Sequence, residues 1–456
     1  MTLDSFFRPK SVAVIGASRD PKKPGHVIFR NLLESGYKGR VTPVNIHAET
    51  ILGVKCYSSI MAVKEKVELA VIAIPAPFVP EALEQCGKAG VKAAIILAGG
   101  FSEVGNKELE KKTKQMLKKY KMRAIGPNCL GLYDAYSGID TLFNPKYKLG
   151  RPASGPISFI SQSGAILTAV ADWMSMKGYR ASKFISYGNA IDVGEAELLE
   201  YLAKDPHTRV ICIYIEGVRE GRRFFEAAKN VSSRKPIIAL KGGITTFGSK
   251  AVGSHTGSLA GSARIYSAMF RQAGIIEATN MESLFDIART LSKQPKTKGP
   301  RVQVITDGGG FGILAADHIY KYGLQLARMS PSSIASIKKQ LPPHIVTDPI
   351  IDLTGSADEN GYRTAINAAL DDDNVDILMV IALFQLPSLG GEIVDVIAEA
   401  NSMRKKPMVF IAAGGKFTEM LKKSIEDNGV PTFSYPEQAV MAIKALADYS
   451  KNSKLH

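Results

Sequence analysis

The sequence is poor in cysteine and contains no long hydrophobic run. Its 456 residues include four cysteines, which are widely spaced and form no CxxC pair: Cys56, Cys86, Cys129 and Cys212. This spacing argues against a zinc ribbon or a disulfide framework and favours a reducing compartment. No apolar run reaches the roughly 18 residues that a membrane-spanning helix needs, and the segment MTLDSFFRPKSVAVIGAS lacks the pattern of a secretory signal. We therefore expect a cytoplasmic protein that does not enter a membrane.

Acidic residues are fewer than basic ones. The chain has 58 lysines and arginines against 43 aspartates and glutamates, a formal net charge of +15. The lysines are spread along the chain, and the densest run, residues 107–121, also contains glutamate, as is typical of a solvated helix face. We expect no nucleic-acid partner, because the charge is not gathered in one patch. The excess of basic residues is consistent with an acidic ligand or a protein partner.

Short apolar runs alternate with helix-length segments in three successive series. The first series includes SVAVIG, VTPVNI, VELAVIAIP and VKAAIILAGG. This alternation predicts βαβ units and a parallel sheet that is covered on both faces. Turn residues between Tyr133 and Pro156 and the linker Pro295–Pro300 separate the series. We therefore expect an α/β chain of three consecutive parallel-sheet domains, at residues 1–132, 150–294 and 301–456.

The third series is an internal repeat of the second. A comparison of the two shows which residues only the second series contains. KPIIALKGG in the second series is followed by an extra segment, Ile244–Ala263, which contains His255. In the third series, KPMVFIAAGG passes almost directly into a helical run. The end of RVICIYIEG holds Glu216, whereas the corresponding part of VDILMVIALFQL has no acid. The histidine and the carboxylate are both additions to the scaffold, as expected of a functional site.

His255 lies in GSHTGSLAGS, among small residues whose backbone N–H groups can approach an anion. A neutral imidazole can attack phosphorus with one nitrogen if a carboxylate holds the proton on the other, and Glu216 is the candidate. A solvated loop histidine is the plain alternative. Metal ligation fits less well, since no other histidine has a paired spacing with His255, and SQSGA is not the GxSxG elbow of a hydrolase. The pattern favours a phosphorylated histidine.

Three small-residue loops follow apolar runs and precede helices: Gly16–Ser18, Ser161–Ala165 and Thr306–Gly312. In open α/β sheets ligands bind beyond the carboxyl ends of the strands, so each loop is a candidate anion site. The GxGxxG fingerprint is missing, and no acidic residue ends the second apolar run, which weakens a nicotinamide reading. The prolines of IPAPFVP and GPNCLG fix extended segments and favour a ligand groove.

Five ordered motifs together resemble the NDP-forming acyl-CoA synthetase superfamily, whose other branch is succinyl-CoA ligase. They are IPAPFVP, GPNCLG, ISFISQSGAIL, ISYGNAIDVGEAELLEYLAKDPHTRVICIYIEG and GSHTGSLAGS. The third domain points to the α subunit of the ADP-forming acetate–CoA ligases. The resemblance implies a Rossmann-like domain that binds coenzyme A, a flavodoxin-like ligase domain with the phosphohistidine loop, and a second flavodoxin-like ligase domain.

The resemblance also implies roles for residues at matching positions. His255 matches the phosphorylated histidine, and Glu216 matches the glutamate that orients it. The implied coenzyme A site consists of Gly16, Ala17, Ser18, Pro43, Asn45, Ile74, Pro75, Ala98 and Asn128. The implied phosphoryl and acyl site consists of Ser161, Gln162, Ser163, Gly164, Asn189 and Ser254.

The implied reaction converts acyl-CoA, phosphate and ADP into acid, ATP and coenzyme A through an acyl phosphate and a phosphohistidine at His255. None of the three series predicts an ATP-grasp domain, so we expect a separate ATP-grasp β subunit in an α2β2 assembly. That subunit would carry most of the ADP/ATP and Mg²⁺ site, and we expect no metal site in this chain. Three alternatives are an α subunit like that of succinyl-CoA ligase, a non-catalytic regulatory protein that binds coenzyme A, and a NAD-dependent oxidoreductase.

Overall fold

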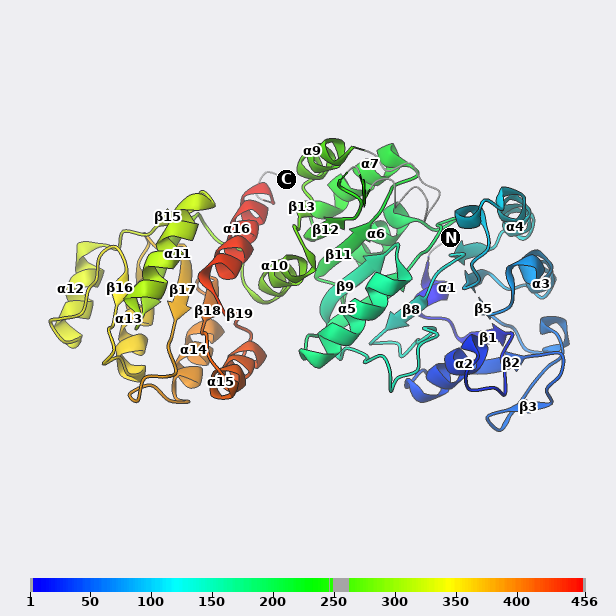
Figure 1. The fold of residues 1–456 in the computed structure, drawn as a ribbon, viewed down its shortest axis with the longest axis horizontal. Coiled ribbons are helices and arrows are strands. Elements are labelled where there is room, and N and C mark those ends of the chain that lie inside the picture. Colours follow the sequence, from blue (N-terminus) through cyan, green and yellow to red (C-terminus); the bar gives the residue numbers. More distant parts are fainter. Residues whose placement is uncertain (1–2, 246, 249–261, 454–456) are drawn as a thin grey trace. The chain divides into compact units, whose positions relative to one another are not determined.

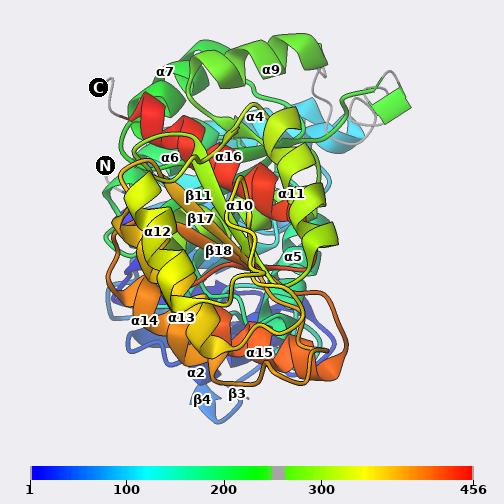
Figure 2. The ribbon, with the colours of Figure 1, turned by 90° about the vertical axis from the view of Figure 1, so that its left-hand side faces the viewer.

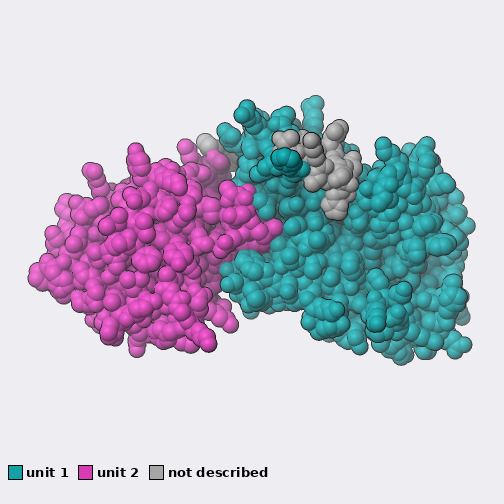
Figure 3. Space-filling model, viewed as in Figure 1, with its two compact units in different colours: residues 1–277 teal, residues 278–456 magenta. Residues whose placement is uncertain are grey.

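The computed structural model describes residues 3–245, 247–248 and 262–453. The chain divides into two units, Met1–Glu277 and Ala278–His456, which are coloured separately in Figure 3. In the described residues the first unit contains two large sheets and a two-stranded hairpin, and the second unit contains one sheet. No helix in the described part of the chain is both long and apolar enough to cross a membrane.

The first sheet is parallel throughout, with strand order β2-β1-β5-β6-β7. Its strands are β1 Ser11–Ile15, β2 Arg40–Val44, β5 Leu69–Ile72, β6 Ala93–Ile96 and β7 Arg123–Ile125. Val12 and Val14 of β1 join the core under α2, whereas Ala13 and Ile15 join the core under α3 and α4. Alternate side chains thus bury both faces, which explains the unbroken apolar runs in the sequence.

Helices and short elements complete this part of the chain. They are α1 Asp4–Phe7, α2 Pro24–Glu34, the hairpin of β3 Thr50–Ile51 and β4 Val54–Lys55, η1 Ile60–Ala62, η2 Ala76–Phe78, α3 Val79–Lys88, η3 Ser102–Val104 and α4 Lys107–Tyr120. Helix α4 is the predicted lysine-rich helix.

The second sheet has the strand order β13-β12-β11-β9-β10-β8. Its strands are β8 Gly131–Asp134, β9 Ser154–Ser161, β10 Ala181–Ser186, β11 Val210–Ile215, β12 Ile237–Lys241 and β13 Ile276–Glu277. Its helices are α5 Gly164–Met176, α6 Glu195–Lys204, α7 Gly221–Ser232 and α9 Ala263–Gln272. Helix α5 packs on β9 and β10 (Figure 1), and the buried side chains of α6, α7 and α9 share a core with β11 and β12.

Within the described strands of the three large sheets, one departs from the expected parallel arrangement. Strand β8 pairs antiparallel with β10 at the edge of the second sheet, although the sequence analysis predicted no strand there and placed its last two residues in an irregular connection. A four-residue strand is too short to show a periodicity, and its partners lie about fifty residues further along the chain. Long-range pairing therefore formed a strand that the local pattern did not reveal.

The second unit holds a parallel sheet of order β15-β14-β17-β18-β19, with β16 also paired to β14. Its strands are β14 Arg301–Thr306, β15 Gln325–Leu326, β16 Ile351–Asp352, β17 Ile377–Ile381, β18 Met408–Ile411 and β19 Thr432–Phe433. Its helices are α10 Met281–Lys293, α11 Gly309–Lys321, α12 Pro331–Gln340, α13 Glu359–Asp371, α14 Ile393–Ser402, α15 Lys416–Asp427 and α16 Pro436–Asn452. Helices α11 and α16 share one core with the sheet, and α12 to α15 share the other (Figure 2).

Helix α10 belongs to this second unit, although the sequence analysis grouped its residues with the second domain. It packs against α16, and Arg289 and Lys293 make ion pairs with Glu426 of α15 at 2.9 and 2.5 Å. The three domain ranges given above remain predictions. These contacts hold α10 against α15 and α16 of the second unit.

Candidate functional site

A cavity of about 570 Å³ opens at the carboxyl ends of the central strands of the first unit. Its walls come from the segments that follow β6, β7, β9, β10 and β11. The lining residues include Leu97, Gly99, Asn128, Cys129, Leu130, Phe143, Asn144, Gln162, Ser163, Gly164, Ala165, Thr168, Gly188, Asn189 and Glu216. The structure thus brings together, from both sheets, six residues that the sequence analysis selected. Strand ends are where open α/β sheets bind ligands.

The N-terminus of α5 forms one wall of this cavity. Ser161 ends β9 and donates its hydroxyl to the carbonyl oxygen of Ser163 at 2.6 Å. Ser163 is the N-cap, and its hydroxyl accepts the N–H of Ile166 at 3.4 Å. Gly164 begins the helix without a side chain to cover its first turn. Unpaired N–H groups and the helix dipole make such a terminus favourable for a phosphate.

Gln162 links this loop to the end of β11. Its side-chain oxygen accepts the backbone N–H groups of Glu216 at 2.9 Å and Gly217 at 3.1 Å. Glu216 is 6% exposed and lines the cavity. Gln162 therefore holds the backbone that carries the candidate carboxylate.

Lys241 and Tyr266 hold the same segment, which carries Glu216, through hydrogen bonds to its backbone. The sequence analysis did not identify either residue. The Lys241 ammonium donates to the carbonyl oxygen of Glu216 at 2.9 Å and also to that of Gly242, and it lies 4.7 Å from the ring centre of Tyr266. Burial lowers the pKa of Lys241, while Glu216 opposes that effect. The Tyr266 hydroxyl accepts the N–H of Val218 at 3.0 Å. A lysine at a strand end carried no signal that distinguished it from a surface lysine.

Two further loops meet beside α5. Asn189 donates its backbone N–H to the carbonyl oxygen of Pro127 at 2.9 Å, and the Asn128 side-chain N–H donates to the side-chain oxygen of Asn189 at 3.3 Å. Gly188 has φ +55°, and a Cβ there would lie 2.2 Å from the oxygen of Pro127. Only glycine allows the two loops to approach this closely. Asn128 and Asn189 therefore reach the cavity as a hydrogen-bonded pair.

A second pocket, of about 380 Å³, lies at the carboxyl edge of the first sheet. It contains Gly16, Asn45, Ile74 and Pro75, four of the residues selected for the coenzyme A site, beside apolar side chains such as Phe78. Gly16 has φ +87°, and a Cβ there would lie 2.5 Å from the oxygen of Ala73. This close approach requires glycine.

Four other residues of the predicted coenzyme A site do not line either pocket. The carbonyl oxygen of Ala17 accepts the Asn45 amide at 2.7 Å, and that of Ala98 accepts the backbone N–H of Asn128 at 2.8 Å. The carbonyl oxygen of Ser18 lies 2.8 Å from Nδ1 of His26. Pro43 lies within β2, where its carbonyl oxygen accepts the N–H of Tyr57 at 3.1 Å. Ala17, Pro43 and Ala98 shape the loops through backbone atoms, and the Ser18 hydroxyl also accepts the backbone N–H of Asp20 at 3.1 Å.

The third candidate anion loop, at α11 in the second unit, is acidic. Thr306 donates its hydroxyl to the carbonyl oxygen of Gly308 at 3.1 Å, as Ser161 does at α5. The next residue is Asp307, whose carboxylate accepts the N–H of Leu383 at 3.0 Å from each oxygen. Burial raises the pKa of Asp307 to about 6.

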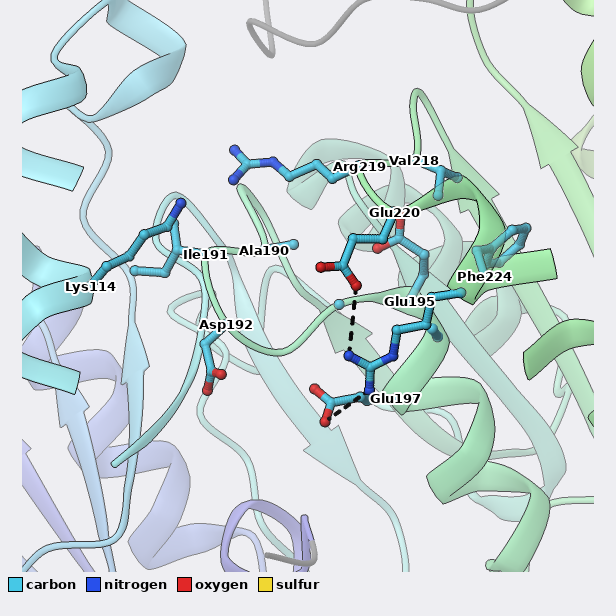
Figure 4. Close-up of a pocket in the computed structure, with 13 residues that line it drawn as sticks. Lys114, Ala190, Ile191, Asp192, Glu195, Glu197, Val218, Arg219, Glu220 and Phe224 are labelled. Carbon is cyan, nitrogen blue, oxygen red and sulfur yellow. Dashed lines mark ion pairs between the residues drawn. The ribbon is translucent and has the colours of Figure 1, made fainter. Parts of the chain in front are cut away.

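A charged pocket on another side of the first unit joins α4 to the segments around α6 and α7 (Figure 4). Arg223 pairs with Glu197 at 3.4 Å and with Glu220 at 3.7 Å. Arg219 also pairs with Glu110 of α4 at 3.4 Å. Four acidic side chains, Asp192, Glu195, Glu197 and Glu220, line this pocket beside three basic ones, Lys114, Arg219 and Arg223. Its ion pairs connect the two sheets of the unit.

Two predicted residues, His255 and Ser254, lie outside the described part of the chain. Among the residues that the structure does describe, no group of three or more His, Cys, Asp or Glu side chains is arranged to hold a metal ion. The four cysteines are free and buried.

Three family models match the chain in order. They are a CoA binding domain at residues 10–135, a succinyl-CoA ligase like flavodoxin domain at residues 154–291 and a Ligase-CoA domain at residues 302–455. Together with the cavity at the strand ends, this order defines the class: the protein is an acid–thiol ligase with a CoA-binding domain and flavodoxin-like ligase domains.

Full-length relatives narrow this class. The chain is 41% identical to subunit alpha of the ADP-forming acetate–CoA ligase II of Pyrococcus furiosus, covering 99% of this chain and 98% of the relative. It is also 41% identical to the ADP-forming acetate–CoA ligase of Methanocaldococcus jannaschii, covering 97% of this chain but 62% of that longer relative. The chain belongs to the family of ADP-forming acetate–CoA ligases.

A solved structure agrees with this assignment. The acetyl-coenzyme A synthetase 1 of Ca. Korarchaeum cryptofilum, in complex with phosphate and ADP, superposes with a TM-score of 0.93 at 38% identity, covering 99% of this chain and 97% of that chain. The expected α/β class with Rossmann-like and flavodoxin-like domains is confirmed.

Proposed function

We propose that this chain is the α subunit of an ADP-forming acetyl-CoA synthetase that makes acetate, ATP and coenzyme A from acetyl-CoA, phosphate and ADP. The observation that carries the proposal is the 570 Å³ cavity, which joins the Asn128–Asn189 pair, the N-terminus of α5 and Glu216. The reaction needs these elements at one place: an amide pair for the acyl group and helix N–H groups for the anion during acyl transfer, and a carboxylate for the histidine during phosphoryl transfer.

The first step forms an acyl phosphate. A phosphate oxygen, held by the N–H groups at Gly164, attacks the thioester carbonyl carbon, the C–S bond breaks, and coenzyme A leaves as a thiol after taking up a proton. Gly16, Asn45, Ile74 and Pro75 line the pocket proposed for the nucleotide and the start of the pantetheine chain. Ala17, Pro43 and Ala98 would contribute through their backbone, and Ser18 through its backbone and its hydroxyl.

The second step transfers the phosphoryl group to His255. One imidazole nitrogen attacks phosphorus, the P–O bond to the acyl oxygen breaks, and acetate leaves. Glu216 holds the proton on the other nitrogen and stabilises the cationic ring as it forms. Ser161, Gln162, Ser163 and Ser254 belong to the same proposed phosphoryl site. ADP then takes the phosphoryl group from His255 and becomes ATP.

The last transfer requires a partner subunit in this proposal. The Pyrococcus relative is named a subunit, and the longer Methanocaldococcus relative carries sequence beyond the region that this chain covers. We assign the ADP/ATP and Mg²⁺ site mainly to an ATP-grasp β subunit in an α2β2 assembly. The four free and buried cysteines support a cytoplasmic location.

Thiol release tests the proposed first step. The purified chain, with and without an ATP-grasp partner, is mixed with acetyl-CoA, and free thiol is followed after adding phosphate or arsenate. We expect release that depends on either anion, and sustained release with arsenate because acyl arsenates hydrolyse. Succinyl-CoA serves as the comparison substrate. Coenzyme A binding without anion-dependent release would contradict the proposal and favour a regulatory protein.

A further inference from the structure

Glu103 is hydrogen-bonded to Asn189, a residue in the loop after β10 that lines the cavity. Glu103 lies in η3, within the part of the chain that forms the first sheet. Its carboxylate accepts the side-chain N–H of Asn189 at 2.5 Å. Asn189 in turn accepts from Asn128 at 3.3 Å. Both asparagines line the cavity, so a chain of three side chains runs from Glu103 to the ligand-facing surface.

The carboxylate of Glu103 is held firmly by the backbone. One of its oxygens accepts the N–H of Gly100 at 2.5 Å, and both accept the N–H of Phe101, at 3.1 and 3.2 Å. Phe101 is fully buried and anchors the turn. Burial raises the pKa of Glu103, but the hydrogen bonds from Gly100 and Asn189 outweigh burial and leave the pKa below its usual value. Glu103 is therefore ionised at neutral pH.

An ionised carboxylate accepts hydrogen bonds and donates none. Asn189 must therefore turn its NH₂ group toward Glu103, which directs its oxygen to the NH₂ group of Asn128. Each asparagine then keeps one further N–H. A neutral residue at position 103 would permit either orientation of the Asn189 amide and would not fix which polar atoms reach the cavity.

We propose that Glu103 is a positioning residue that fixes the amide orientation of Asn189 and Asn128, so that their remaining N–H groups receive an oxygen of the acyl group. This inference rests on the proposed function and assigns a specificity role at the same site. It predicts that Glu103 contributes to recognition of the acyl carbonyl oxygen and not to binding of the coenzyme A nucleotide.

The test compares acetyl-CoA and coenzyme A binding to the full chain by calorimetry. Glu103→Gln preserves the size of the side chain but introduces an NH₂ group that cannot accept from Asn189. We expect the Kd for acetyl-CoA to rise about tenfold, the scale of a hydrogen bond to a charged group, while the Kd for coenzyme A stays within about twofold. Glu108→Gln, an exposed change on α4, is the matched control and should leave both constants unchanged.

A second variant guards against a folding defect. Asn189→Ser removes the side chain that Glu103 orients while leaving the backbone bond from Asn189 to Pro127, and it should show the same selective loss for acetyl-CoA. Equal weakening of both ligands in Glu103→Gln, with normal binding by the control, would overturn the inference in favour of a merely structural turn. Unchanged acetyl-CoA binding would overturn it as well. Failure of the wild-type chain to bind either ligand would instead contradict the proposed function on which it rests.

Discussion

The N-termini of α5 and α11 are two versions of one strand–turn–helix unit. The pairing of Ser161 with Tyr214 and of Thr306 with Ile381 makes Leu383 the counterpart of Glu216. At each helix, the residue that follows the serine or threonine accepts the N–H of that counterpart. The acceptor is the neutral side-chain amide of Gln162 at α5 and the carboxylate of Asp307 at α11. The backbone geometry is shared, and the charge distribution is not.

This difference in charge indicates which copy of a duplicated fold can bind an anion. In the proposed site, a phosphate at α5 would meet helix N–H groups without a neighbouring charge from Gln162. At α11 it would lie beside Asp307, and Asp352 is close enough that a Cβ on Gly309 would lie 2.8 Å from its oxygen. Like charges at such distances oppose binding in a poorly solvated site. The scaffold supplies the helix terminus, and a few side chains decide whether it is used.

The largest effect is expected at the position where the two units differ most. Glu216→Gln should lower phosphoryl transfer by about 100-fold or more, because an amide cannot stabilise a cationic imidazole as a carboxylate does. Formation of ATP from acetyl-CoA, phosphate and ADP with the partner subunit measures this. Asp307→Asn is the matched change in the second unit and should retain the wild-type rate. A comparable loss in Asp307→Asn would show that α11 also takes part.

An acidic residue directly after Ser161 should abolish the charge difference between the N-termini of α5 and α11. Gln162→Asp places a carboxylate where α11 has one, so we expect the KM for phosphate to rise by about tenfold or more through charge repulsion. Gln162→Met removes the hydrogen bonds to Glu216 and Gly217 without adding charge, and should raise KM less. Equal effects of the two substitutions would indicate that only the lost hydrogen bonds matter.

The acidity of the α11 loop predicts a pH-dependent stability difference. The pKa of Asp307 is raised to about 6 in the folded chain, above its value of about 4 in an unfolded one. Between these values the folded state binds more protons, so the contribution of Asp307 to stability falls as pH rises from about 4 to 6, by up to about 3 kcal/mol.

Asp307→Asn removes this titration. The variant should unfold at a higher temperature than the wild type at pH 7, and the gap should narrow toward pH 4.5, where Asp307 is protonated. Differential scanning calorimetry of both proteins at the two pH values measures the gap. A gap that is the same at both values would show that Asp307 is ionised throughout.

The smallest effect concerns the helix caps. Ser163 caps α5 with its hydroxyl, whereas Gly308 gives α11 no side-chain cap. The 3.4 Å length of the Ser163 bond suggests a weak cap, so Ser163→Ala should cost about 0.5 kcal/mol of unfolding free energy. Urea denaturation measures the change. A cost above about 2 kcal/mol would mean that Ser163 makes a stronger contribution than its cap.

Much of the fold could be predicted from the sequence because its central strands are buried on both faces and read as apolar runs. The internal repeat also revealed Glu216, since Leu383 occupies the corresponding place. Strand β8 could not be predicted from its own residues, because its pairing with β10 is a long-range effect. Lys241, Tyr266 and Glu103 escaped for a similar reason: their roles come from contacts with distant backbone or side chains, and single polar residues show no periodicity. The role of His255 remains a prediction.

The central claim is that the first unit carries a phosphoryl group on His255. The direct measurement is the intact mass of the chain after incubation with acetyl-CoA, phosphate and Mg²⁺, for the wild type and for His255→Ala. The account predicts an acid-labile phosphoryl adduct on the wild type and none on the variant. An adduct on both proteins, or no adduct on the wild type even with the partner subunit and other acyl-CoAs present, would contradict it.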